Sequence, residues 1–159
     1  MRRYNKILFV CTENTARSLM AEKICRNMII DEDLEILSRG LVVLFSEPVN
    51  PKAEIVLINH GLTVEGRTAR LLEQSDMDED TLVFTMTLEQ KNKLSRDYDI
   101  VSNLFTMKEF VEEEGDVMDP YGKTLVEYEL CYGELSRIIK KIVIKLRKTY
   151  GLQETETMQ

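Results

Sequence analysis

A cysteine and an arginine near the start of the chain have the residue types and the spacing of a phosphoryl-transfer site. Cys11 precedes Arg17 by six positions, and Ser18 follows the arginine. A cysteine thiolate is a strong nucleophile and can accept a phosphoryl group as a covalent intermediate. The planar guanidinium of Arg17 can bind two phosphate oxygens, and the hydroxyl of Ser18 can hydrogen-bond the Cys11 sulfur. Taken alone, Cys11 would be interpreted as a small buried residue at a strand end.

The pattern around these residues favours the catalytic interpretation. The apolar run Ile7–Val10 predicts a buried strand, and Met20–Ile24 opens a helical pattern. In a short loop between a strand and a helix, backbone N–H groups converge and the helix dipole favours negative charge. The sequence therefore predicts an oxyanion site here. Its candidate substrate-binding residues are Thr12, Glu13, Asn14, Thr15 and Ala16.

A second segment, Asp116–Gly122, carries a candidate acid. Asp-Pro followed by Tyr-Gly is a turn signal, so Asp119 is expected on a rigid, exposed loop. It is either a turn-forming or capping aspartate, or a general acid that protonates the leaving group and later activates water. Tyr121 either lines the mouth of the cleft or covers the edge of the core. The only histidine, His60, precedes a predicted helix stop, so a general acid should be a carboxylate.

Strands and helices alternate along the chain, which is typical of a parallel sheet covered on both faces. Strands are predicted at residues 6–11, 34–37, 80–86 and 103–106, and helices at 18–30, 51–60, 87–95 and 124–148. The predicted fold is a single doubly wound α/β domain over residues 1–150, with a mostly parallel four-stranded sheet and the phosphate-binding loop after the first strand. Residues 151–159 are predicted to form a polar tail. An apolar stripe on the last helix is interpreted as core: Leu125, Tyr128, Tyr132, Leu135, Ile139, Ile142 and Leu146.

The composition excludes several classes of function. The chain has 159 residues and a formal net charge of −7, which argues against nucleic acid and anionic membranes as partners. Three widely spaced cysteines, Cys11, Cys25 and Cys131, do not form a disulfide framework or a zinc motif. Without a signal peptide or a long apolar run, the sequence predicts a cytoplasmic protein.

In combination, the Cys11…Arg17-Ser18 loop and Asp119-Pro120 resemble the low-molecular-weight protein-tyrosine phosphatases. The resemblance covers nearly the whole chain. It includes Ile7–Thr12, Met20–Glu22, Ser38–Gly40, Ala69–Arg70, Met86–Thr87 and Gly115–Pro120. It implies that Cys11 is the nucleophile and Arg17 the phosphate clamp, that Ser18 stabilises the thiolate, and that Asp119 is the general acid and base.

The same resemblance implies the supporting groups and the reactants. Asn14 would hold the shape of the loop, with Ser38 as its partner. The family uses no metal or cofactor. Its members act on phosphorylated proteins, with inorganic phosphate as product and inhibitor.

Several positions depart from the family pattern. Glu13 stands where glycine is usual, which would strain the loop if that position needs a positive φ or a close backbone approach, and its charge would repel a phosphate dianion. Ala16 stands where a second cysteine is frequent, Leu19 replaces a usual proline, and Arg67 replaces a frequent histidine. Thr15 resembles the threonine of the bacterial protein-arginine phosphatases at this position. The physical rationale is that a small polar wall tolerates a guanidinium beside the phosphorus better than an aliphatic wall does.

Three functional alternatives follow. The first is a cysteine-dependent protein phosphatase that acts on phosphotyrosine or phosphoarginine. The second is a phosphate-binding module without catalysis, in which Glu13 and Leu19 have weakened the site. The third is arsenate reductase, which needs further cysteines to pass a disulfide along, and Cys25 and Cys131 lack the required spacing.

Overall fold

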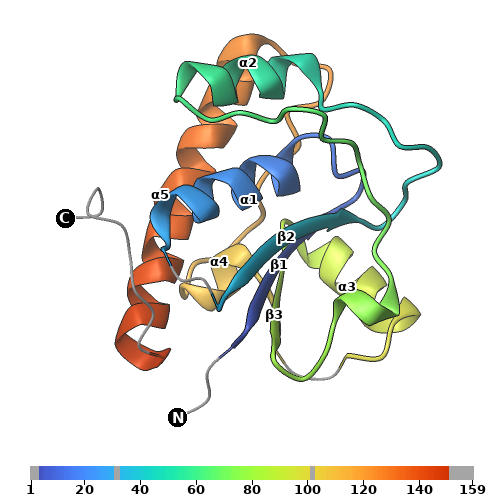
Figure 1. Cartoon of the computed structure of the whole chain (residues 1–159), viewed down its shortest axis with the longest axis vertical. Helices are drawn as coiled ribbons and strands as arrows, with labels where there is room; N and C mark the ends of the chain where they lie inside the picture. The colour runs from blue at the N-terminus through green and yellow to red at the C-terminus, as the bar shows by residue number, and fades with distance from the viewer. Residues whose placement is uncertain (1–3, 31–32, 101–102, 151–159) are drawn as a thin grey trace.

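Four parallel strands form one sheet in the order β2-β1-β3-β4. The computed structural model describes residues 4–30, 33–100 and 103–150 (Figure 1). The strands are β1 (Lys6–Cys11), β2 (Glu35–Gly40), β3 (Thr81–Thr85) and β4 (Leu104–Thr106). The predicted α/β fold with a parallel four-stranded sheet is therefore confirmed. The predicted tail, 151–159, lies outside the described residues.

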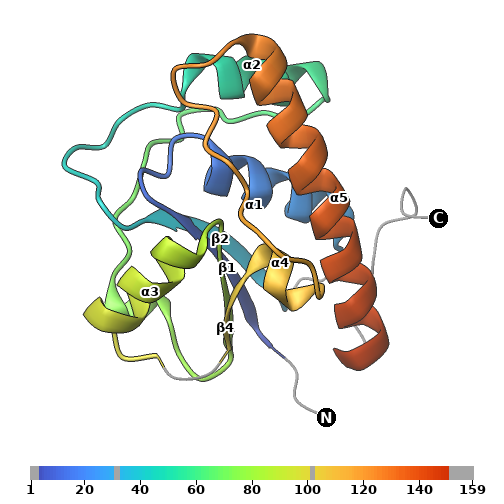
Figure 2. The same cartoon turned by 180° about the vertical axis from the view of Figure 1, so that it is seen from behind.

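Helices cover both faces of this sheet (Figures 1 and 2). The longer helices are α1 (Arg17–Met28), α2 (Pro51–Asn59), α3 (Leu88–Asp97) and α5 (Leu125–Tyr150), and the short ones are η1 (Gln74–Asp76) and α4 (Met107–Phe110). Because successive side chains of a strand point to opposite faces, β1 contributes to two cores. Ile7 and Phe9 belong to the core shared with α1, α2 and α5, whereas Leu8 and Val10 pack on the α3 side with Leu94.

Two boundaries differ from the prediction. Strand β2 continues to Gly40 instead of ending at Leu37, because residues 38–40 remain paired with Phe9, Val10 and Cys11 of β1. The apolar stripe of α5 is buried from Tyr128 to Leu146, but Leu125 is 40% exposed because it opens the helix at the molecular surface. The stripe packs beside α1, α2 and α4. Within the described part of the chain, no helix is long and apolar enough to cross a membrane.

Candidate active site

The loop between β1 and α1 is open at its centre to an anion. Cys11 is the last residue of β1 and Arg17 is the first residue of α1. The N-cap of α1 is Ala16, whose side chain cannot accept a hydrogen bond from the first turn. The N–H groups of that turn therefore remain available to another acceptor, and a phosphate oxygen is the acceptor that a helix N-terminus favours.

The Cys11 sulfur lies in a buried polar environment. Cys11 is only 4% exposed, and its thiol donates a hydrogen bond to the Ser18 Oγ atom at 2.9 Å. The backbone N–H of Asn14 donates to the same sulfur at 3.4 Å. The Nδ2 atom of Asn14 also donates to Ser18 Oγ at 2.8 Å, so the Ser18 proton is free to turn toward a Cys11 thiolate. The arrangement can stabilise negative charge on the sulfur.

Asn14 supplies the bend in the loop and fixes it. Its φ is +59°, a left-handed conformation that asparagine tolerates better than most residues. Its side chain donates to Ser38 Oγ at 3.0 Å and accepts from the Arg70 backbone N–H at 3.0 Å. Glu13 is not among the described residues with positive φ. Position 13 therefore does not need the positive φ under which glutamate would strain the loop, because Asn14 takes the left-handed conformation.

Arg17 is held between the loop and the segment that carries Asp119. Its side chain is only 6% exposed, and Nη1 donates to the Val117 carbonyl at 2.7 Å. Its Nη2 atom lies 3.6 Å from Asp119 Oδ2. The other oxygen of Asp119 accepts from the Tyr121 N–H at 3.1 Å, which is a turn formed by an aspartate side chain. With 55% of its side chain exposed, Asp119 can exchange protons with solvent.

These residues enclose a cavity of about 120 Å³. It is lined by every predicted site residue except the two supporting serines, Ser18 and Ser38, which lie behind the loop. Asn50 and Tyr128 also line it, although neither was predicted. Burial, and next the charge of Asp119, raise the pKa of Tyr128, so its hydroxyl stays protonated beside the cavity. The apolar stripe of the last helix predicted Tyr128 as a core residue. Tyr128 is buried in the core and also lines the cavity.

Gln90 of α3 is a third residue that sequence reasoning missed. Its Nε2 atom donates to Thr12 Oγ1 at 3.1 Å, and its Oε1 atom accepts from the backbone N–H groups of Met86 and Thr87. Thr87 is the N-cap of α3 and Gln90 completes the capping box. The Thr-x-x-Gln spacing in the sequence predicts the cap. The contact between Gln90 and the phosphate loop depends on tertiary structure and cannot be predicted from that spacing.

A buried ion pair supports the loop from behind. Glu22 of α1 is fully buried and accepts from Ser38 Oγ at 2.8 Å and from Arg67 Nη1 at 2.7 Å. Arg67 also donates to Ser38 Oγ at 3.0 Å. Burial by itself would raise the pKa of Glu22, but the hydrogen bond and charge of Arg67, with help from Arg26, outweigh it and the pKa is lowered. Ser38 thus joins this pair to Asn14.

Exchanging Arg67 for methionine should lower the free energy of unfolding by about 3 kcal/mol at neutral pH, because it leaves the Glu22 carboxylate buried without its main partner. The lowered pKa means that the Arg67–Glu22 contact stabilises the wild type fully above the ordinary Glu22 value of 4.5 and less as the pH falls below it. In the variant, Glu22 prefers to be protonated, so acid stabilises it.

Urea unfolding should therefore show a gap between the Arg67→Met variant and the wild type that narrows from pH 7 toward pH 5. The matched control is Arg137→Met. It breaks an ion pair with Glu113 at 2.8 Å on the surface and should cost much less. A gap that widens in acid would contradict the role of Glu22.

The other titratable candidates lie apart from the cavity lining. Burial raises the pKa of Cys25 and of Cys131 to about 12, so both remain thiols. All three cysteines are free. Neither Cys25 nor Cys131 lines the cavity of Cys11, whereas an arsenate reductase needs further cysteines to pass a disulfide along. His60 follows α2, where its ring stacks on Tyr132 at 3.9 Å and contacts Glu129. Within residues 4–30, 33–100 and 103–150, no three His, Cys, Asp or Glu side chains cluster as metal ligands.

Comparison with known proteins gives a consistent result. A family described as "Low molecular weight phosphotyrosine protein phosphatase" matches residues 6–152. A relative from Staphylococcus haemolyticus, the low molecular weight protein-tyrosine-phosphatase PtpB, is 34% identical over 137 residues. That alignment covers 86% of this chain and 96% of the relative.

Two solved structures are also similar. The low molecular weight protein tyrosine phosphatase from T. tengcongensis is 37% identical with a TM-score of 0.81, and the match covers 89% of this chain and 99% of that one. The arginine phosphatase YwlE, in a variant with a phosphorylated active-site serine, is 26% identical with a TM-score of 0.82. In this case the match covers 92% of this chain and 98% of that one.

Proposed function

This chain belongs to the low molecular weight phosphotyrosine protein phosphatase family, and we propose that it hydrolyses phosphorylated protein side chains through a phosphocysteine at Cys11. Membership makes it a phosphatase. The observation that carries the mechanism is the cavity in which Cys11, Arg17 and Asp119 meet. We also propose that residues 1–150 form the phosphatase domain and that 151–159 are a tail.

In the first step, the Cys11 thiolate attacks phosphorus and the bond to the leaving oxygen or nitrogen breaks. Asp119, as an acid, gives its proton to the leaving group. The Ser18 hydroxyl, oriented by Asn14 at 2.8 Å, donates to the sulfur and lowers the cost of its negative charge. The products are the dephosphorylated side chain and a phosphoryl group on Cys11.

In the second step, water attacks the phosphocysteine. The Asp119 carboxylate takes the proton of the water, the sulfur–phosphorus bond breaks, and Cys11 leaves as a thiolate. Inorganic phosphate is released and, because it fits the same loop, inhibits the enzyme. The phosphoryl oxygens are bound by backbone N–H groups of the loop and of the first turn of α1 and by the Arg17 side chain, whose hydrogen bond to Val117 keeps its guanidinium in the cavity wall. No step requires a cofactor.

The substrate is either phosphotyrosine or phosphoarginine. Tyr121 and Tyr128 line the cavity and can stack on a phenyl ring or a guanidinium. Thr15 is half-buried in the same wall, and it is smaller and more polar than an aliphatic residue there. Arginine phosphatases among the similar structures support phosphoarginine, and the tyrosine phosphatases support phosphotyrosine.

The deciding experiment measures phosphate release from phosphotyrosine and phosphoarginine peptides in parallel, with a reductant and with a metal chelator. A strong preference for one peptide identifies the substrate class. Failure to hydrolyse either peptide, by a folded protein that still binds inorganic phosphate, would overturn the proposal in favour of a binding module.

An Asp119→Asn variant should lower kcat by about 10²-fold on phosphotyrosine peptides, because asparagine cannot donate a proton to a poor leaving group. Asparagine keeps the oxygen that accepts from the Tyr121 N–H, so the turn is preserved. p-Nitrophenyl phosphate, whose leaving group needs little protonation, serves as the control. With this substrate, Asp119→Asn should slow the first step, formation of the phosphocysteine, much less. Stopped-flow release of p-nitrophenol measures that step. Equal losses on both substrates would show that Asp119 is not the acid.

A further inference from the structure

A second cavity adjoins the catalytic one and has a distinct chemistry. Its volume is about 120 Å³, and the chain segment 42–45, Glu13, Glu47 and Ala69 line it. Glu13 lines the catalytic cavity as well, so the two cavities are neighbours across one residue. We call this second cavity the side groove.

The side groove is held rigidly against the phosphate loop. The Leu41 N–H donates to the Cys11 carbonyl at 3.0 Å, and the Val42 N–H donates to the Thr12 carbonyl at 2.9 Å. At its far end, the Glu47 carbonyl accepts from the Ala69 N–H at 2.8 Å. Because both ends are tied to fixed elements, the groove has a defined position relative to the reacting sulfur.

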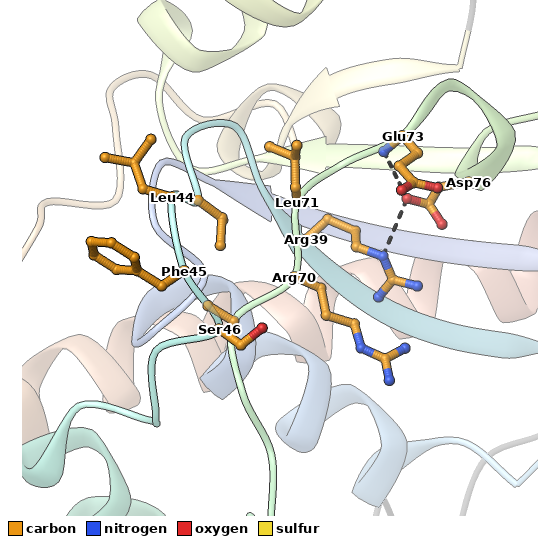
Figure 3. A pocket seen from close by; sticks show the side chains of 10 residues that line it. Arg39, Leu44, Phe45, Ser46, Arg70, Leu71, Glu73 and Asp76 are labelled. Carbon is orange, nitrogen blue, oxygen red and sulfur yellow. Dashed lines mark hydrogen bonds and ion pairs between the residues drawn. The ribbon is translucent and has the colours of Figure 1, made fainter.

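The two carboxylates of the groove lack cations of their own. Glu13 and Glu47 are exposed, and neither forms an ion pair with another described residue. The nearby arginines line a larger cavity of about 380 Å³, which shares residues 43–45 and Ala69 with the groove but not its two carboxylates. Figure 3 shows Phe45 pointing away from Arg39 and Arg70 in that cavity, and Arg39 is engaged with Asp76 at 3.2 Å. Among the described residues that line the groove, the only charged side chains are therefore the two carboxylates.

The remaining walls suit the stem of a long basic side chain. Leu44 is 82% exposed and Phe45 is 69% exposed, and Val42 lies beside them. Lysine and arginine lay their methylene stems on apolar surface and keep the charge at the polar end. An ammonium or guanidinium is also attracted to the face of an aromatic ring such as Phe45. Aliphatic wall, aromatic ring and unpaired carboxylates together fit a cation, whereas an acidic or small side chain gains nothing there.

We propose that the side groove binds a lysine or arginine that flanks the phosphorylated residue in the protein substrate. The inference rests on the proposed function and specifies which phosphoproteins it acts on. It also gives Glu13 a purpose. A carboxylate on the rim of a phosphate site repels the phosphate, and a neighbouring cation of the substrate offsets that repulsion.

The test compares phosphopeptides that carry lysine, alanine or glutamate at each neighbouring position in turn. At the favoured position, lysine should raise kcat/KM about fivefold over alanine, and glutamate should lower it, as expected for a partly exposed charge contact. High salt should reduce the preference. Glu47→Gln should remove most of it while p-nitrophenyl phosphate, which does not reach the groove, is hydrolysed as before. Glu65→Gln, which changes another exposed glutamate that lies outside both cavities, is the matched control.

Binding separates the two proposals. The Cys11→Ala variant, which cannot react, is titrated with the same fluorescent phosphopeptides. If the wild type hydrolyses no peptide but Cys11→Ala still binds lysine peptides more tightly than alanine peptides, the proposed function fails and the proposal for the groove stands. If peptides are hydrolysed and bound alike whatever flanks the phosphorylated residue, or if the preference survives in Glu47→Gln, the groove does not bind the basic residue.

Discussion

Replacing Cys11 with alanine should reduce phosphate release by about 10⁴-fold or more, because a thiolate is a far stronger nucleophile than the hydroxyls and carboxylates of the other described residues that line the cavity. The oxyanion site should survive this change. The loop N–H groups and Arg17 remain, so inorganic phosphate should still bind. The measurements are steady-state release from a phosphopeptide and calorimetric titration with phosphate.

The control for loss of a thiol is Cys25→Ala, which removes a buried cysteine of α1 that lies outside the cavity lining. It should keep its turnover. Wild-type enzyme quenched in acid during turnover should carry one phosphoryl group on the peptide that contains Cys11, and Cys11→Ala should carry none. Unchanged release by Cys11→Ala would disprove covalent catalysis at this residue.

The positions of the nucleophile and the clamp were predictable because they are determined locally. An apolar run, a short polar loop and a helical pattern place Cys11 at a strand end and Arg17 at a helix start, whatever the remaining chain does. The turn signal around Asp119 predicted an exposed loop for the same reason. That this loop lies over Arg17, with Asp119 Oδ2 3.6 Å from Nη2, could be expected only from the family resemblance.

The residues that were missed are those whose effect depends on packing between distant segments. Gln90 satisfies a helix cap locally, and its contact with Thr12 exists only because α3 begins beside the phosphate loop. Tyr128 fits an apolar stripe, yet it lies in the first turn of α5 and lines the cavity. Periodicity identifies a buried face but not what lies opposite it.

Glu13 shows a different limit. Sequence comparison marked it as a departure from glycine, and the natural inference was backbone strain. In the folded loop the left-handed residue is Asn14, so Glu13 is not a left-handed residue, and its side chain lines both cavities. Arg67 is similar: the departure from histidine is visible in sequence, but only the structure supplies its partner, the buried Glu22. An arginine stays charged at every physiological pH, so this support of the loop does not titrate as a histidine would.

An Arg17→Lys variant should have a kcat about 10³-fold lower than the wild type. In the wild type, Arg17 donates to the Val117 carbonyl at 2.7 Å and can bind two phosphate oxygens in one plane at the same time. Lysine keeps the positive charge, but its single ammonium group cannot make both sets of contacts. The planar guanidinium fits the equatorial oxygens best when phosphorus is five-coordinate. Its loss should therefore weaken transition-state binding more than ground-state binding.

Steady-state kinetics and thermal unfolding of Arg17→Lys test this directly, with Arg137→Lys on the outer face of α5 as a control for the same chemical change. A fall in kcat with a small change in KM identifies Arg17 as a group that acts in the transition state. A rise in KM with kcat unchanged would mean that the guanidinium holds substrate and transition state equally. Catalysis would then depend on the sulfur, Asp119 and the backbone N–H groups, and the charge of Arg17 would serve only to bring the phosphate into the loop.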